Sequence, residues 1–362
     1  MSGACDEHLR RPWLLRELGP SLNRRRDRLD ELLALDDSDL VAAIGGPRRE
    51  ELSAALARWG ARAASLARSE ARACGLTISC RCDPDYPQRL LESASAPSAL
   101  YICGDAELFA ERCRNQAVAI VGCRRPSPYG LAVAHELGRS LAAAGMEVVS
   151  GLADGIDTEA HTGALAAGGP TIAVLAGAPH VPYPRGQRFL HGQILITGAA
   201  ISEVSPGTAT RPWTFVARNR IIAALASITV VVEAGRRSGA LITAAAAAAL
   251  GRTVGAVPGQ ITTPTATGAL ELLAGGALLV RRAQDVLDCV YGVGARSASI
   301  DRRPPPTLEQ ELILRAVGAG KDTVGALTGL GVSGSDALAE LAALELAGWI
   351  RRGPGGRLAV MP

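Results

Sequence analysis

The spacing of apolar residues divides the chain into three parts. Between residues 10 and 74 apolar side chains recur at helical intervals, so residues 1–75 are predicted to form a helical module. Residues 76–290 alternate short β-rich apolar runs with helical patterns, which predicts an α/β domain. Residues 307–362 follow a basic, proline-rich linker at 291–306 and form a third unit.

The central part predicts a mostly parallel sheet covered by helices on both faces, because its strands are almost continuously apolar. Strands are expected at residues 76–81, 97–104, 118–121, 146–150, 171–175, 200–203, 228–233 and 253–257. Helices are expected at residues 130–144, 158–167, 188–197, 215–225 and 239–250. This alternation is typical of an extended Rossmann-like fold.

The flanking parts have their own patterns. The N-terminal module includes a long Arg/Ala-rich amphipathic run at residues 50–73, which predicts one helix. The tail predicts helices at 308–317, 323–328 and 335–347, followed by strands at 349–352 and 357–360. Three helices and a terminal hairpin form a winged-helix-like pattern.

Composition fits a globular protein and limits the alternatives. The 362 residues are 48% hydrophobic and 20% charged, and no apolar run reaches the roughly 18 residues of a membrane span. The N-terminus lacks a signal-peptide core, so the cytoplasm is the expected location. The net charge of +3 does not by itself predict nucleic-acid binding. Between residues 115 and 260, however, the sequence contains eleven arginines and seven acidic residues, so this part of the chain is positively charged.

The cysteines and histidines predict neither a metal site nor a catalytic nucleophile. The eight cysteines are scattered, and only Cys80 and Cys82 are close in sequence, without a second pair at zinc-finger spacing. They are therefore expected to be reduced thiols. The five histidines are dispersed, and His161 is expected to be a packed side chain rather than a base.

Two glycine turns predict a phosphate-binding crevice. Gly122 ends one strand and precedes a loop with Arg124, while residues 151–155 form a second turn after the next strand. The loop lacks the G-x-G-x-x-G pattern, and Ser150 stands where a dinucleotide site would place an acidic residue. No dinucleotide cofactor is therefore expected. Asp157 is expected to cap the following helix.

Two further strand-to-helix regions carry basic or amide groups, namely residues 218–220 and 236–239. Because ligands bind at the carboxyl ends of parallel strands, all these turns are predicted to converge on one polyanion. The predicted phosphate-binding residues are Gly122, Arg124, Ser127, Gly151, Ala153, Gly155, Arg218, Asn219, Arg220, Arg237, Ser238 and Gly239.

A series of motifs resembles the DNA-processing protein A (DprA, or Smf) family. In order they are VAIVG-C-R, SGLA-x-GID, TIAVLA, Tyr183-Pro184, SE at 202–203, F-x-x-RNRIIA, VVVEA, SGALITA and AVPG, and they span residues 86–287. Two departures are mild: Cys123 replaces the usual serine, and Val216-Ala217 alters the segment before Arg218. Asp154 stands where the family often has a basic residue, which puts one phosphate contact in doubt.

The resemblance implies a non-enzymatic recombination mediator without a cofactor. Such proteins bind single-stranded DNA, form homodimers, protect incoming DNA and load the RecA recombinase during natural transformation. Members commonly add an N-terminal helical module, here of the SAM or helix-hairpin-helix type, and a C-terminal winged helix. With only three phenylalanines in the chain, base stacking is expected to be sparse.

Two other classes of function remain open on the residues alone. A nucleotide-cleaving hydrolase on a similar sheet would need a positioned carboxylate, for which Glu203 and Glu233 at strand ends are candidates. A transcription regulator would instead bind duplex DNA through the winged helix.

Overall fold

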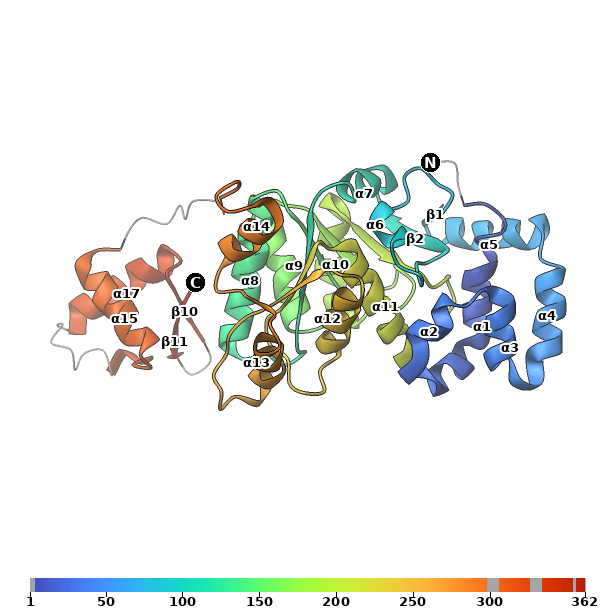
Figure 1. Ribbon diagram of the computed structural model, residues 1–362. Coiled ribbons are helices and arrows are strands. Elements are labelled where there is room, and N and C mark those ends of the chain that lie inside the picture. Colours follow the sequence, from blue (N-terminus) through green and yellow to red (C-terminus); the bar gives the residue numbers. More distant parts are fainter. Residues whose placement is uncertain (1–3, 298–305, 326–333, 354–355, 362) are drawn as a thin grey trace.

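The computed structural model describes residues 4–297, 306–325, 334–353 and 356–361. It places the N-terminal helices beside one edge of the central sheet (Figure 1). Within the described residues, no helix has both the length and the apolar character needed to cross a membrane.

From residue 4 onward, where the structure describes it, the N-terminal module has five α-helices: α1 (Arg10–Arg24), α2 (Leu29–Ala34), α3 (Asp37–Ile44), α4 (Arg49–Ala57) and α5 (Ala61–Ala73). The prediction of a single helix at residues 50–73 is wrong, because the backbone is extended at Gly60 and divides α4 from α5. Among its described residues, the buried apolar side chains share their cores with the central domain. Leucines of α1 and α2 pack together with Trp213 and Ala217 of the central domain.

The predicted mostly parallel sheet is confirmed. Within the described residues the sheet has nine strands in the order β1-β2-β6-β5-β4-β3-β7-β8-β9, and only β1–β2 and β2–β6 pair antiparallel. The strands are β1 (Thr77–Cys80), β2 (Ala99–Gly104), β3 (Ala117–Val121), β4 (Glu147–Ser150), β5 (Thr171–Val174), β6 (Ala199–Ser202), β7 (Ile228–Val231), β8 (Thr253–Ala256) and β9 (Leu278–Leu279).

Helices cover both faces of this sheet and bury its alternating side chains in two layers. One layer includes residues of α8, α9 and α14, and the other includes residues of α11, α12 and α13. The helices are α6 (Gln88–Leu91), α7 (Ala106–Arg112), α8 (Pro128–Ala143), α9 (Ile156–Ala166), α10 (Arg188–Thr197), α11 (Pro212–Leu225), α12 (Gly239–Ala249), α13 (Thr267–Ala274) and α14 (Ala283–Tyr291).

The C-terminal unit has a small core of its own. Helices α15 (Leu308–Gly318) and α17 (Gly334–Leu346) pack with the antiparallel strands β10 (Ile350–Arg352) and β11 (Leu358–Val360). The helix predicted at residues 323–328 lies largely outside the described residues. The winged-helix assignment therefore stays a prediction.

Candidate nucleic-acid interface

The main candidate site lies where the direction of the chain through the sheet reverses. Strands β3 and β7 are parallel neighbours, but from β3 the chain proceeds to β4 on one side and reaches β7 on the other. Such a switch point leaves a crevice at the carboxyl ends of the strands. A pocket of about 540 Å³ lies there, lined by the loops after β3, β4 and β7 and by α11 and α12.

Glu233 fixes the backbone of the loop after β3 through hydrogen bonds. The Glu233 carboxylate accepts hydrogen bonds from the amide of Ser127 at 2.8 Å and from its hydroxyl at 2.5 Å. Gly122 allows close packing, because a Cβ there would lie 2.4 Å from Cγ1 of Ile156. With its backbone fixed in this way, the loop presents Arg124 to solvent at the pocket edge.

The second glycine turn is organised by Asp157. Its carboxylate accepts hydrogen bonds from the amides of Gly151 at 3.1 Å and Ala153 at 3.4 Å. Leu152 between them has a φ of 57°, an uncommon conformation for a bulky residue. The expectation that Asp157 caps α9 is wrong, because the residue at the N-cap position is Gly155 and the Asp157 side chain closes the turn instead.

Arg218 forms part of the pocket wall beside this turn. Its Nη1 donates to the carbonyl of Val174 at 3.1 Å and lies 4.0 Å from the carboxylate of Asp157. Burial lowers the pKa of Arg218 and raises the pKa of Asp157. Arg218 is only 7% exposed, so it can contribute positive charge to the wall but little free surface.

The opposite wall is the N-terminus of α12. The Ser238 hydroxyl accepts from the amide of Ala240 and caps this helix, and Asn219 donates to the carbonyl of Gly239 at 3.2 Å. The exposed Arg237 lies next to the cap. A helix N-terminus flanked by arginine is a favourable environment for phosphate.

An aromatic pair borders the pocket, and sequence reasoning did not assign it to the site. The Arg124 guanidinium lies 5.3 Å from the ring centre of Phe215, and the Tyr183 ring packs edge-on against Phe215 at 5.4 Å. Both rings and Arg124 line a smaller adjoining cavity. The Tyr183-Pro184 motif could have indicated a role for Tyr183 in the site. Its contact with Phe215 could not be predicted, because the two residues are far apart in sequence.

Most predicted site residues converge as expected, and three do not line either cavity. Arg220 is 4% exposed, and its guanidinium binds both carboxylate oxygens of Glu203 at 2.5 Å. Ser127 is engaged by Glu233, and Gly155 packs beneath the first loop. The residues brought to the two cavities are Gly122, Arg124, Gly151, Ala153, Arg218, Asn219, Arg237, Ser238 and Gly239.

Asp154, the departure from the family pattern, is exposed beside the aromatic pair. Its carboxylate accepts a hydrogen bond from Nε2 of Gln187 at 2.9 Å, and the residue lines the smaller cavity with Tyr183. A negative charge at this position opposes a polyanion that extends from the main pocket over the rings.

Two further groups of possible ligands do not line the pocket, namely the buried His161 and a cluster of cysteines with one histidine. Burial lowers the pKa of His161 to about 3, and its Nδ1 lies 2.7 Å from the Thr171 hydroxyl, so it is a packed side chain as predicted.

The expectation that the cysteines and histidines form no cluster is wrong. Cys5, His8, Cys80 and Cys82 gather at the edge of the sheet, because the fold brings together segments about 75 residues apart.

Comparison with known sequences gives a consistent assignment. The model of the family described as DNA recombination-mediator protein A matches residues 77–291. A DNA processing protein DprA of Mycobacterium tuberculosis is 41% identical over 260 residues, covering 70% of this chain and 66% of that protein. The DprA of Bacillus subtilis is 36% identical over 203 residues, covering 56% of this chain and 67% of that protein.

Solved structures agree with the sequences. The structure of DprA from Streptococcus pneumoniae has a TM-score of 0.62 at 31% identity and covers 79% of this chain and 98% of its own. The DprA of Helicobacter pylori, described in terms of its single-stranded DNA binding mode, has a TM-score of 0.50 at 27% identity and covers 59% of this chain and 94% of its own. The chain belongs to the family of DNA recombination-mediator protein A.

Proposed function

We propose that the pocket at the switch point binds the backbone of single-stranded DNA. The observation that carries this proposal is the placement of Arg124, Arg237 and the N-terminus of α12 around one open pocket. Guanidinium groups and helix N-termini are recurrent phosphate ligands. The relative from Helicobacter pylori, whose structure is described by its single-stranded DNA binding mode, supports single-stranded DNA as the class of ligand.

The aromatic pair suggests how bases are accommodated. Phe215 and the exposed Tyr183 lie beside Arg124, so a strand whose phosphates contact that arginine passes over both rings. Stacking on aromatic rings is tolerant of sequence, because every base presents a flat π surface. We therefore expect binding with weak sequence preference.

The test is a pair of arginine substitutions with a matched control. Arg124→Ala and Arg237→Ala should each weaken binding of an oligothymidine strand several-fold at low salt. Each should reduce the slope of log affinity against log salt by about 0.7, the value for one phosphate contact on a single strand. Arg62→Ala, which removes an exposed arginine from α5, is the control. Unchanged affinity and slope in both pocket variants would place the DNA elsewhere.

We propose in addition that the protein acts in the cytoplasm as a homodimer that protects incoming DNA and loads RecA during natural transformation. Membership of a recombination-mediator family supports this role. The measurement is RecA filament assembly on single strands coated with single-strand binding protein. A lack of acceleration by the full chain would contradict the loading step while leaving DNA binding intact.

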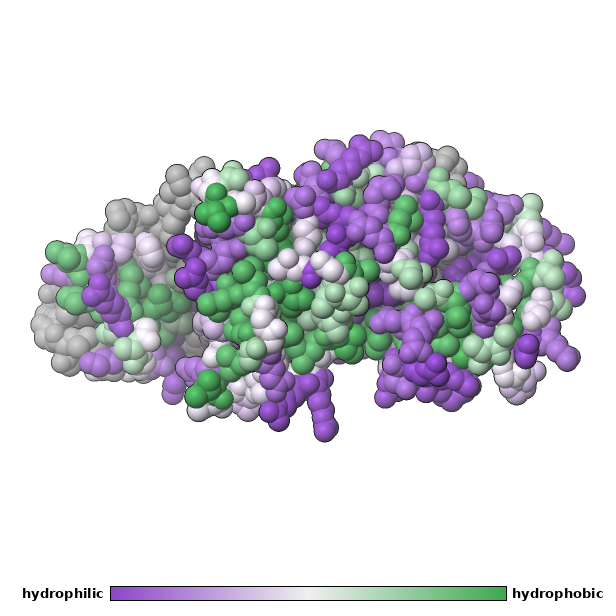
Figure 2. All heavy atoms as spheres, viewed as in Figure 1, coloured by the Kyte–Doolittle hydropathy of each residue, from purple (hydrophilic) through white to green (hydrophobic). Residues whose placement is uncertain are grey.

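The dimer has a candidate surface on the central domain. Hydrophobic residues gather over α12 and α13 in Figure 2, around a groove of about 790 Å³ lined by Leu241, Ala245, Leu272 and Leu278. An exposed apolar groove of this kind suits a second protein surface. Ala245→Arg should convert the dimer to a monomer in sedimentation analysis, whereas a parent chain that is monomeric would remove this surface from the proposal.

Direct assays distinguish the two other classes of function from the proposed one. Both candidate carboxylates for a hydrolase are already engaged, Glu203 by Arg220 and Glu233 by Ser127. Release of base or phosphate from a nucleotide, abolished by Glu203→Gln or Glu233→Gln, would support the hydrolase. Tighter binding to duplex than to single strands would support the winged-helix regulator.

A further inference from the structure

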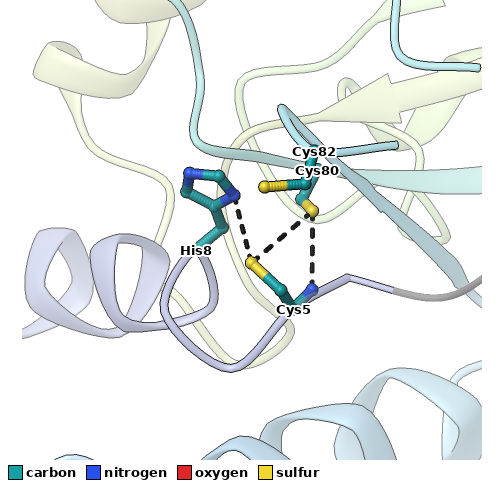
Figure 3. Close-up of side chains that lie close together, drawn as sticks. All are labelled: Cys5, His8, Cys80 and Cys82. Carbon is teal, nitrogen blue, oxygen red and sulfur yellow. Dashed lines mark hydrogen bonds between the residues drawn. The ribbon is translucent and has the colours of Figure 1, made fainter. Parts of the chain in front are cut away.

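Four potential metal ligands converge at the edge strand of the sheet. Cys5 and His8 precede α1, Cys80 ends β1, and Cys82 lies in the turn that follows. Figure 3 shows the three sulfur atoms and the imidazole directed into one shared space. We propose that these side chains bind one zinc ion, which fastens the N-terminal segment to the central domain.

The distances suit a tetrahedral zinc site. One ligand atom from each side chain lies within 4.8 Å of all the others. The sulfur atoms of Cys5 and Cys80 are 3.9 Å apart, and Cys5 Sγ lies 3.2 Å from Nδ1 of His8. With Zn–S bonds of about 2.3 Å and Zn–N bonds of about 2.0 Å, tetrahedral geometry requires ligand separations of roughly 3.5–3.8 Å. The Cys5–Cys80 and Cys5–His8 separations differ from this range by a few tenths of an ångström, and the widest pair of ligand atoms would have to close by up to about 1 Å.

Contacts outside the cluster hold both segments in position. The carbonyl of Asp6 accepts from Nε1 of Trp59 at 2.8 Å, and the carbonyl of His8 accepts from the Ser98 hydroxyl at 2.9 Å. On the other side, the Asp83 carboxylate accepts from the amide of Cys80 at 2.8 Å. The four ligands are therefore positioned by the fold, which lowers the ordering cost of binding a metal.

The ligand set favours zinc in a structural role. Three thiolates and one imidazole form the soft, four-coordinate set typical of structural zinc, with no position left for substrate. The amide of Cys5 lies 3.4 Å from Sγ of Cys80 and can donate a hydrogen bond to this proposed ligand.

The site would connect segments that are distant in sequence. A zinc ion bound by both Cys5 and Cys80 would close a loop of about 75 residues, a length at which a crosslink strongly restricts the unfolded chain. Metal binding would then stabilise the attachment of the N-terminal module to β1, the edge strand of the sheet.

The experiment measures metal content and a spectroscopic signature on the full chain. The protein is purified under reducing conditions, and its zinc content per chain is measured by elemental mass spectrometry. Cobalt is then exchanged into the protein, because tetrahedral thiolate-bound cobalt has intense visible bands. Cys82→Ser and Cys5→Ser remove single ligands, and Cys289→Ser, an exposed thiol in α14, is the matched control.

We expect one zinc per chain in the parent and in Cys289→Ser, and near-complete loss after brief chelator treatment in the ligand variants. A strong chelator should lower the unfolding temperature of the parent much more than that of Cys82→Ser, which binds zinc weakly. Absence of stoichiometric zinc together with absence of the cobalt bands in the parent would overturn the proposal, whether or not the variants fold. Zinc retained equally by both ligand variants, or a Cys5–Cys80 disulfide in the reduced preparation, would also overturn it.

Discussion

At the scale of single residues, the candidate interface depends on the contact between Gly151 and Arg218. A Cβ on Gly151 would lie 1.1 Å from Nη1 of Arg218, so the arginine occupies space that any other residue would fill. The same guanidinium reaches the carbonyl of Val174 and approaches Asp157, whose carboxylate fixes the glycine turn. One small residue thus allows a buried cation to lie directly against the turn at the end of β4.

Gly151→Ala is therefore expected to destabilise the protein by about 1–3 kcal/mol, the usual cost of overpacking a filled site. It should also weaken single-strand binding, because Arg218 must leave the pocket wall. Urea unfolding and a fluorescence binding titration measure the two effects. Gly186→Ala, where a Cβ would meet nothing within 4 Å, is the control and should behave like the parent. Equal stability of the Gly151 variant and the parent would contradict the packing described.

At the scale of elements, the sequence predicted β1 to β8 and the longer helices that cover the sheet because their patterns are strong, but not the two-residue strand β9. Buried parallel strands such as β3 and β7 are apolar throughout, and α10 begins and ends where its pattern predicts. The short helices α6, α7, α13 and α14 were not predicted, since four to nine residues carry too little periodicity.

Part of the candidate site could also be predicted from the sequence, because it depends on local turns that follow the strands. Glycine turns after strands indicate where ligands bind, and Arg124 and Arg237, which were predicted from such turns, both line the pocket. Local sequence does not reveal long-range partners. Arg220 pairs with Glu203 across 17 residues, and Cys5 meets Cys80 across 75. Such contacts depend on tertiary packing, which cannot be read from a single sequence.

Packing between elements also places a carboxyl group in an unfavourable position at the start of β4. Burial raises the pKa of Glu147 from 4.5 to about 6, although Asn115 and Arg112 lie nearby. Because the folded pKa lies above the unfolded one, the folded state binds more protons in this interval. Stability therefore falls as the pH rises from 4.5 to about 6 and stays lower above it.

Glu147→Gln should remove this fall, which amounts to about 2 kcal/mol for the shift given. The free energy of unfolding measured in urea across this pH range should be flatter in the variant than in the parent. Glu107→Gln, an exposed glutamate on α7, is the control and should keep the slope of the parent. A slope unchanged by Glu147→Gln would show that this carboxyl group is not the source.

At the scale of the whole molecule, the three parts predicted from sequence differ in how they depend on one another. The N-terminal helices share a core with α11, the helix that also carries Phe215 and Arg218 to the pocket. The C-terminal unit instead buries its own cluster, including Ile313, Leu341 and Leu358. The N-terminal module is thus part of the support for the interface, whereas the C-terminal unit packs around a separate core.

Two truncations of the chain should therefore behave differently. A chain ending at residue 297 keeps the sheet and both neighbouring cores, so its unfolding temperature and single-strand affinity should match those of the full chain. A chain starting at residue 76 exposes Trp213, which is fully buried in the full chain, and the lost burial amounts to on the order of 4 kcal/mol. Loosening α11 should then also weaken DNA binding, because Phe215 and Arg218 lie on it. Calorimetry and the binding titration on both chains measure this difference. Equal unfolding temperatures for the full chain and the chain starting at residue 76 would show that the helical module does not support the interface.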